Sequence, residues 1–186
     1  WVIRRLTALK IGQPVRGYRA PSFSVDARTP WAHAVLAEQG YAYSSSVAPV
    51  VHDHYGWAQS PRHAWQPLHD SALIEWPVTT ARFAGRTLAA GGGGFMRLLP
   101  YGFTRWAIER MNREGHPAIL YFHPWEIDPG QPRVADAPLR SKVRHYTGLS
   151  AMAGKLKKLL DDFEWTRADA LLAAQRYRAR PWRTAA

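Results

Sequence analysis

The segment 120–126 joins an apolar run to side chains that could do chemistry. The run 118–122 predicts a strand, and His123 follows at its carboxyl end, just before Trp125 and Glu126. Residues beyond the carboxyl ends of strands form the active sites of open α/β sheets and barrels. A histidine titrates near neutral pH, and neighbours such as these can tune its pKa. His123 is therefore a candidate for proton transfer, and a structural histidine packed on Trp125 is the alternative.

A second candidate lies where the predicted strand 15–20 ends, in the run Arg19-Ala20-Pro21-Ser22-Phe23. An arginine at this position can hold a carboxylate through two parallel hydrogen bonds. Pro21 restricts the backbone, so that the N–H group that follows can point into a pocket. An ordinary strand-ending turn with a surface arginine is the alternative.

A pair of histidines, His52 and His54, flanks Asp53 on the long polar loop 49–70. A His-x-His pattern on a loop could ligate a metal ion. No third ligand follows at a telling spacing, so the pattern favours a hydrogen-bonded loop in which Asp53 caps nearby N–H groups. The pattern therefore favours a structural loop over a metal site at these two histidines.

The elements that must position these residues predict an α/β fold. The segment 15–47 contains a strand, a loop, a helix that starts at Thr29-Pro30 and ends at Gly40, and a second strand over 41–47. This order is the βαβ pattern of α/β folds. Further along, the pattern predicts strands over 73–78, 118–122 and 163–165, helices over 103–113, 149–160 and 166–176, and mostly loop over 124–146. A helix over 2–10 comes before all of these.

The glycine run 91–94 requires either flexibility or the close approach of another part of the chain. It does not match the G-x-G-x-x-G pattern that cradles a dinucleotide after a strand. The run therefore predicts a structural turn.

Composition limits the class of protein. A chain of 186 residues suits one domain, and 46% hydrophobic with 21% charged residues is the balance of a globular protein. The net charge of +11 favours anionic partners, and 9 Trp and 8 Tyr offer rings that stack on sugars or bases. The rings are too scattered for a nucleic-acid platform, so we expect no nucleic acid as partner. No apolar run approaches the length of a membrane span, and there is no Cys for disulfides or thiolate sites.

Taken together, several segments resemble one family. They occur in this order: Gly17-Tyr18-Arg19-Ala20-Pro21-Ser22-Phe23-Ser24, Thr29-Pro30-Trp31, Gly40-Tyr41, His52-Asp53-His54-Tyr55-Gly56, Tyr121-Phe122-His123-Pro124-Trp125-Glu126-Ile127-Asp128-Pro129, Gln131-Pro132-Arg133 and Arg144-His145-Tyr146. The set resembles the NodB-type polysaccharide deacetylases, in particular the branch found beside PEP-CTERM/exosortase exopolysaccharide loci. By this resemblance, residues 1–123 form the C-terminal part of a deacetylase barrel, and residues 124–186 form a family-specific C-terminal extension that completes the same domain.

The resemblance implies a partial, distorted (β/α) barrel and the metal-dependent hydrolysis of N-acetyl groups on an exopolysaccharide or related glycan. In that family a divalent metal such as zinc is held by one Asp and two His, and a second Asp acts as the base. Arg19 matches the arginine that holds the base, and the Ser22 N–H matches the donor to the oxyanion. His123 matches the acid toward the leaving amine. Tyr55 and Trp125 are expected as walls of the sugar site.

Two departures from the family pattern affect these expectations. The family's Thr-Phe-Asp-Asp-like and His-x-x-x-His segments precede the position of Trp1, so the resemblance implies that this chain lacks the base Asp and all three metal ligands. The chain alone is therefore expected to be inactive. Ser44 also stands where the family commonly has an Asp that would tune the catalytic histidine.

Two other functions compete with the deacetylase. One is a non-catalytic carbohydrate-binding or scaffolding module of an exopolysaccharide system. The other is a basic binder of an acidic polymer or nucleic acid, suggested by the net charge. We expect a polysaccharide as substrate and no membrane span, in a bacterial protein of either the cytoplasm or the periplasm.

Overall fold

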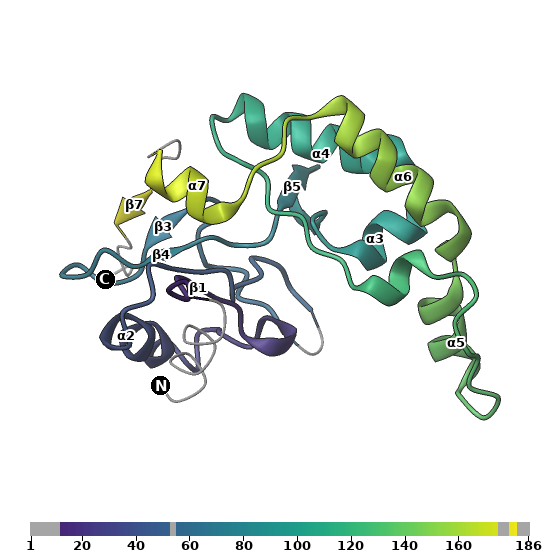
Figure 1. The fold of residues 1–186 in the computed structure, drawn as a ribbon, viewed down its shortest axis with the longest axis horizontal. Helices are drawn as coiled ribbons and strands as arrows, with labels where there is room; N and C mark the ends of the chain where they lie inside the picture. Colours follow the sequence, from purple (N-terminus) through teal and green to yellow (C-terminus); the bar gives the residue numbers. More distant parts are fainter. Residues whose placement is uncertain (1–11, 53–54, 175–178, 182–186) are drawn as a thin grey trace. The chain divides into compact units, whose positions relative to one another are not determined.

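The computed structural model of the chain describes residues 12–52, 55–174 and 179–181 (Figure 1). The helix predicted over residues 2–10 lies outside the described residues. Asp53 and His54 of the possible metal-binding loop lie outside them as well.

The chain divides into two compact units. Unit 1 comprises Trp1–Pro77 and Arg167–Ala186, and unit 2 comprises Val78–Thr166. The division into residues 1–123 and 124–186 was based on family resemblance and not on compactness, so it stays a prediction.

Unit 1 contains a sheet with the strand order β1-β2-β4-β3-β7. Its elements are β1 (Gly17–Tyr18), η1 (Pro21–Phe23), α2 (Trp31–Glu38), β2 (Tyr43–Ser44), β3 (Trp65–Gln66), β4 (Ile74–Glu75), α7 (Ala168–Ala173) and β7 (Arg180–Pro181). Strand β2 pairs in parallel with β1 and β4, whereas β3 pairs antiparallel with β4 and parallel with β7. Because α2 connects the parallel strands β1 and β2, the predicted βαβ unit is confirmed.

Strands β1, β2 and β4 lie in the predicted places, but each is only two residues long. Strand β3 was not predicted, since it falls in the segment 49–70 that was expected to be a loop, and β7 was not predicted either. Polar side chains bind the backbone groups that would otherwise extend the ladder. Ser46 and Val47 donate their N–H groups to the carboxylate of Glu75, at 2.8 and 2.9 Å. The N–H of Ala20 donates to Ser46 Oγ at 2.9 Å. Beyond the ends of β1 and β2, hydrogen bonds to side chains therefore replace hydrogen bonds between strands, close to the candidate residues Arg19 and Ser22.

Unit 2 combines a hairpin with a group of helices. Its elements are β5 (Thr80–Phe83), β6 (Arg86–Ala89), α3 (Gly93–Leu98), α4 (Tyr101–Arg113), η2 (Pro124–Ile127), α5 (Leu139–Tyr146) and α6 (Leu149–Asp162). Helices α4 and α6 confirm the predicted helices over 103–113 and 149–160. They lie side by side in Figure 1, and α3, α4 and α6 share an apolar cluster of Met96, Ile108, Met152 and Leu159.

The segment 80–89 forms an antiparallel hairpin that we did not predict. Its turn places Ala84 and Gly85 at positive φ, 47° and 76°. After the hairpin, the glycine run leads into α3 instead of remaining a turn. The expectation of close approach is confirmed, because a Cβ on Gly93 would overlap the carboxylate of Glu126.

The predicted strand over 118–122 is wrong. The segment makes an isolated parallel bridge between Gly92 and Tyr121. The ladder cannot continue because the partner segment turns into α3 at Gly93.

Two other segments also differ from the prediction. The segment 124–146 was predicted as mostly loop, yet it contains η2 and α5. The segment 163–165 forms no strand, since Phe163 packs on the apolar cluster of α6 and Trp165 Nε1 donates to the carbonyl of Leu159 at 2.8 Å. The segment 163–165 therefore packs against α6 and does not pair with a strand.

The described residues form a mixed α/β structure in which no closed barrel is present. The α/β class is thus confirmed, and the partial, distorted (β/α) barrel stays a prediction. Within the described part of the chain, no helix has both the length and the apolar character needed to span a bilayer.

Neighbouring leucines of α6 allow a test of the unit 2 core. Leu159 is 1% exposed in the apolar cluster, whereas Leu160 is 65% exposed. We expect Leu159→Ala to lower the free energy of unfolding by about 2–5 kcal/mol, because it leaves a cavity. The control Leu160→Ala should change it by less than about 0.5 kcal/mol. Urea unfolding followed by circular dichroism measures both, and equal effects would show that α6 does not face the core in this way.

Candidate functional site

The predicted site residues fall into two groups. Arg19, Ser22 and Tyr55 belong to unit 1, and His123 and Trp125 belong to unit 2. Within each unit the structure brings the members of the group together.

The Arg19 side chain of unit 1 is held by the segment that follows β2. Its Nη2 donates to Ser45 Oγ at 2.7 Å, and its guanidinium carbon lies 5.2 Å from the centroid of the Phe23 ring. Next to it, Ser46 Oγ accepts the N–H of Ala20 and also the hydroxyl of Ser44, at 2.8 Å. Ser44, the departure from the family pattern, is fully buried and supports the turn that carries Arg19.

A buried carboxylate anchors this arrangement. Glu75 is fully buried, and one of its oxygens accepts the N–H groups of Ser46 and Val47. The other oxygen lies 3.1 Å from Nε2 of His33, which is also buried. A buried carboxylate is tolerated only when it is paired and hydrogen-bonded in this manner. Glu75 therefore fixes the end of β2, and through it the turn after β1.

The turn itself is strained. Ser22 has φ 56° and ψ 24°, and Phe23 has φ 51°, so two successive residues other than glycine occupy the left-handed region. The buried Phe23 ring lies 6.0 Å from the ring of Tyr55, which in turn stacks on His52 at 4.0 Å. Such strain persists only where surrounding contacts impose it, and it clusters at functional sites.

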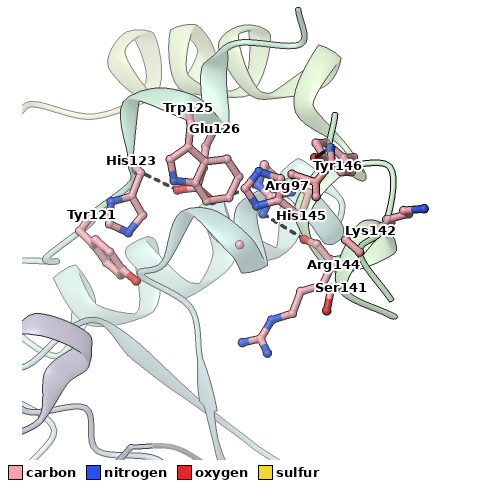
Figure 2. Close-up of a pocket in the computed structure, with 13 residues that line it drawn as sticks. Arg97, Tyr121, His123, Trp125, Glu126, Ser141, Lys142, Arg144, His145 and Tyr146 are labelled. Carbon is pink, nitrogen blue, oxygen red and sulfur yellow. Dashed lines mark hydrogen bonds and ion pairs between the residues drawn. The ribbon is translucent and has the colours of Figure 1, made fainter. Parts of the chain in front are cut away.

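Unit 2 contains a cavity of about 500 Å³ with an aromatic wall, which we call the aromatic pocket (Figure 2). The rings of His123 and Trp125 are nearly parallel, with centroids 6.1 Å apart. The rings of Trp125 and His145 are stacked at 4.1 Å. Tyr121 and Tyr146 meet the two histidines edge to face. The predicted residues His123 and Trp125 therefore line one cavity together.

A buried ion pair holds the walls of the aromatic pocket. Arg97 Nε donates to Glu126 Oε1 at 2.9 Å, and both side chains are only 3% exposed. The same guanidinium donates to the carbonyls at the end of α5: those of Arg144, His145 and Thr147. Its central carbon lies 5.0 Å from the centroid of the Trp125 ring. One arginine of α3 thus connects η2 to the end of α5.

The carboxylate of Glu126 contacts the backbone of His123. The sequence left open that it tunes the His123 imidazole, and in the structure its Oε2 accepts the backbone N–H of His123 at 2.8 Å. The carboxylate therefore fixes the start of η2 and leaves the His123 side chain exposed at the pocket.

The end of α3 is held by a lysine of α6. Lys155 Nζ donates to the carbonyls of Met96 and Leu99, each at 2.8 Å. Burial lowers the pKa of Lys155 from its usual value. Lys155 and the ion pair of Arg97 together fix the C-terminal end of α3.

Several pocket residues were missed by the sequence reasoning. Arg97 carried no signal, because it stands alone in an apolar run. His145 and Tyr146 were part of the family-like segment, but they were not chosen as site residues. His145 Nε2 lies 2.9 Å from Gln131 Oε1, which belongs to the same set of segments.

The described residues provide no group of three or more His, Cys, Asp or Glu side chains that could hold a metal ion. They therefore do not fit the divalent metal that the family resemblance implies. The chemistry available from the described site is hydrogen bonding, proton transfer and contact with aromatic rings.

Substitutions at Ser22 test the strain in the turn. Glycine accepts positive φ without a Cβ clash, so we expect Ser22→Gly to raise the free energy of unfolding by up to about 1 kcal/mol. Ser22→Val should lower it by about 1 kcal/mol or more, because a β-branched residue resists this conformation. As control, Ser24→Val, where φ is −79°, should have little effect in urea unfolding. A harmless Ser22→Val would contradict the strained turn.

The ion pair of the aromatic pocket gives a second test. We expect Arg97→Met to lower the free energy of unfolding by about 3–5 kcal/mol, because it leaves a buried charge on Glu126. The double variant with Glu126→Leu should lose less than the sum of the two single variants. Arg105→Met removes an exposed pair with Glu109 and should change the urea midpoint little. Equal losses at positions 97 and 105 would contradict the anchoring role.

Comparison with known proteins places the chain in one family. Residues 45–173 match a family described as a domain of unknown function, DUF3473. The match covers more than half of the chain and contains all of unit 2, whereas Arg19 and Ser22 precede it. No curated protein and no solved structure matches the chain. The chain belongs to the DUF3473 family.

Proposed function

We propose that this chain is part of a polysaccharide deacetylase and that the aromatic pocket binds a glycan that carries N-acetyl groups. The observation that carries the proposal is the exposed imidazole of His123, which stands beside Trp125 in a cavity with an aromatic wall. Family membership supports it, because the DUF3473 family is associated with polysaccharide deacetylase-like proteins.

The aromatic pocket suits a sugar in size and in chemistry. Its volume of about 500 Å³ lies within the usual range for small-ligand sites. A sugar ring offers apolar C–H faces to aromatic rings and hydroxyls to polar side chains. Tyr121, Trp125 and Tyr146 supply rings, and the imidazoles of His123 and His145 supply both a ring and polar nitrogens.

The chemical role proposed for His123 is general acid. Water adds to the acetyl carbon, and the C–N bond then breaks as the imidazolium gives its proton to the amine nitrogen. The products are acetate and a glycan with a free amine. By resemblance, Arg19 orients the base and the backbone N–H of Ser22 stabilises the oxyanion, and the strained turn that presents Ser22 agrees with such a role. By the same resemblance, the base is an Asp of a family segment that has no match within these 186 residues.

The proposal is tested with an N-acetylglucosamine pentasaccharide. We expect Trp125→Ala to weaken its binding to the chain roughly threefold to tenfold, because a pocket ring is lost. In a protein extended upstream to include the family's catalytic segments, His123→Gln should lower the rate of amine release roughly 10²- to 10⁴-fold with little change in binding. Calorimetry measures the binding, and an amine assay measures the rate.

The controls separate the possible failures. Trp31→Ala removes a tryptophan that is 64% exposed on α2 of unit 1, and it should leave binding unchanged. An unchanged rate in His123→Gln would show that another group is the acid. Binding by the extended protein without any amine release would instead favour a non-catalytic carbohydrate-binding module. Failure to bind the pentasaccharide would overturn the assignment of the pocket.

A further inference from the structure

Basic side chains line the aromatic pocket and continue beyond it. Lys142 and Arg144 line the aromatic pocket, and Arg133 and Lys142 line a further cavity of about 420 Å³. The two cavities share Val134, Lys142 and Tyr146, so they form one continuous surface along α5. We call Arg133, Lys142 and Arg144 the basic rim.

The negative charge at this surface comes from Glu126, and Arg97 neutralises it. Of the described residues that line the two cavities, Glu126 is the single carboxylate. It is buried, one of its oxygens accepts from Arg97, and the other accepts the N–H of His123. The charges of Arg97 and Glu126 therefore cancel, and the basic rim gives the cavities a net positive charge.

The groups of the basic rim can reach a ligand. Figure 2 shows the guanidinium of Arg144 extended away from the other labelled side chains, with no dashed line to any of them. Arg133 lies over the ring of Tyr146, with its guanidinium carbon 4.8 Å from the ring centroid. Lys142 Nζ donates to the carbonyl of Ala135, and this neutral partner leaves its charge uncompensated.

Nucleic acid fits this surface less well than an acidic sugar. Proteins that bind single strands offer separate ring faces on which successive bases stack. Here the rings form one compact cluster around a single pocket, with Trp125 stacked on His145, so there is no row along which successive bases could stack. Arginine forks match the two oxygens of a carboxylate.

We infer that the glycan bound by the aromatic pocket is anionic, with uronic acid carboxylates that contact Arg144 and the rest of the basic rim while the rings hold the sugar. This inference rests on the proposed function and names the substrate class of the same site. It makes the negative charge of the sugar, as well as its N-acetyl group, a contributor to the binding affinity.

Two tetrasaccharides test the inference on the 186-residue chain. One alternates N-acetylglucosamine with glucuronic acid, and the other contains only N-acetylglucosamine. We expect the acidic one to bind roughly tenfold more tightly in calorimetry at low salt, and moderate salt should reduce this preference. Equal affinities would overturn the inference but leave the proposed function intact. Failure of both to bind would overturn the proposed function as well.

Charge variants on one helix locate the effect. Arg144→Gln should weaken binding of the acidic tetrasaccharide roughly threefold to tenfold and leave the neutral one unchanged. Arg140→Gln removes the same charge from α5 at a position that does not line either cavity, and should change binding less than about twofold. Equal losses in the two variants would show general attraction rather than a site. Tighter binding of a thymidine decanucleotide than of the acidic sugar would assign the basic rim to nucleic acid.

Discussion

The arrangement of unit 2 depends on the buried ion pair between Arg97 and Glu126. Desolvation of two charges costs several kcal/mol per ion, so the pair is stable only because nearly every polar atom is bonded. The guanidinium donates to Glu126 and to three carbonyls at the end of α5, and Glu126 also accepts the N–H of His123. A residue larger than glycine at position 93 would displace the carboxylate. The positions of His123, Trp125 and His145 all follow from this one contact.

Unit 1 also contains a buried carboxylate that accepts backbone N–H groups, that of Glu75. Its short strands leave backbone N–H groups beyond the ladder, and the buried carboxylate of Glu75 accepts two of them. Ser46 Oγ in turn accepts the N–H of Ala20, which fixes the start of the turn in which Ser22 has left-handed backbone angles. In both units a buried carboxylate bonds to backbone N–H groups next to the candidate residues. Substitutions that remove either carboxylate would therefore disturb the site and the fold together.

The proposed function joins these features to a single substrate. In this proposal the aromatic wall holds the sugar, the exposed His123 stands beside it, and the basic rim lines the two cavities. The net charge of the whole chain is positive, but the charge at the pocket follows from which acids are already paired. Glu126 is paired with Arg97, so no other carboxylate among the described lining residues is left to neutralise the basic rim.

Local patterns in the sequence were enough to predict the βαβ unit, α4, α6 and the closeness of His123 to Trp125, which are two residues apart. Helical periodicity and strand-ending turns depend on near neighbours, so they can be recognised without the fold. The hairpin over 80–89 was missed because its turn places Ala84, a residue that seldom takes positive φ, beside Gly85. Only the tertiary structure brings Arg97 to Glu126, 29 residues later, and to the carbonyls of α5. Such a contact forms only when distant segments are packed together and bury the two charges. The periodicity and spacing of residues in the sequence do not indicate which distant residue will pair with a buried charge.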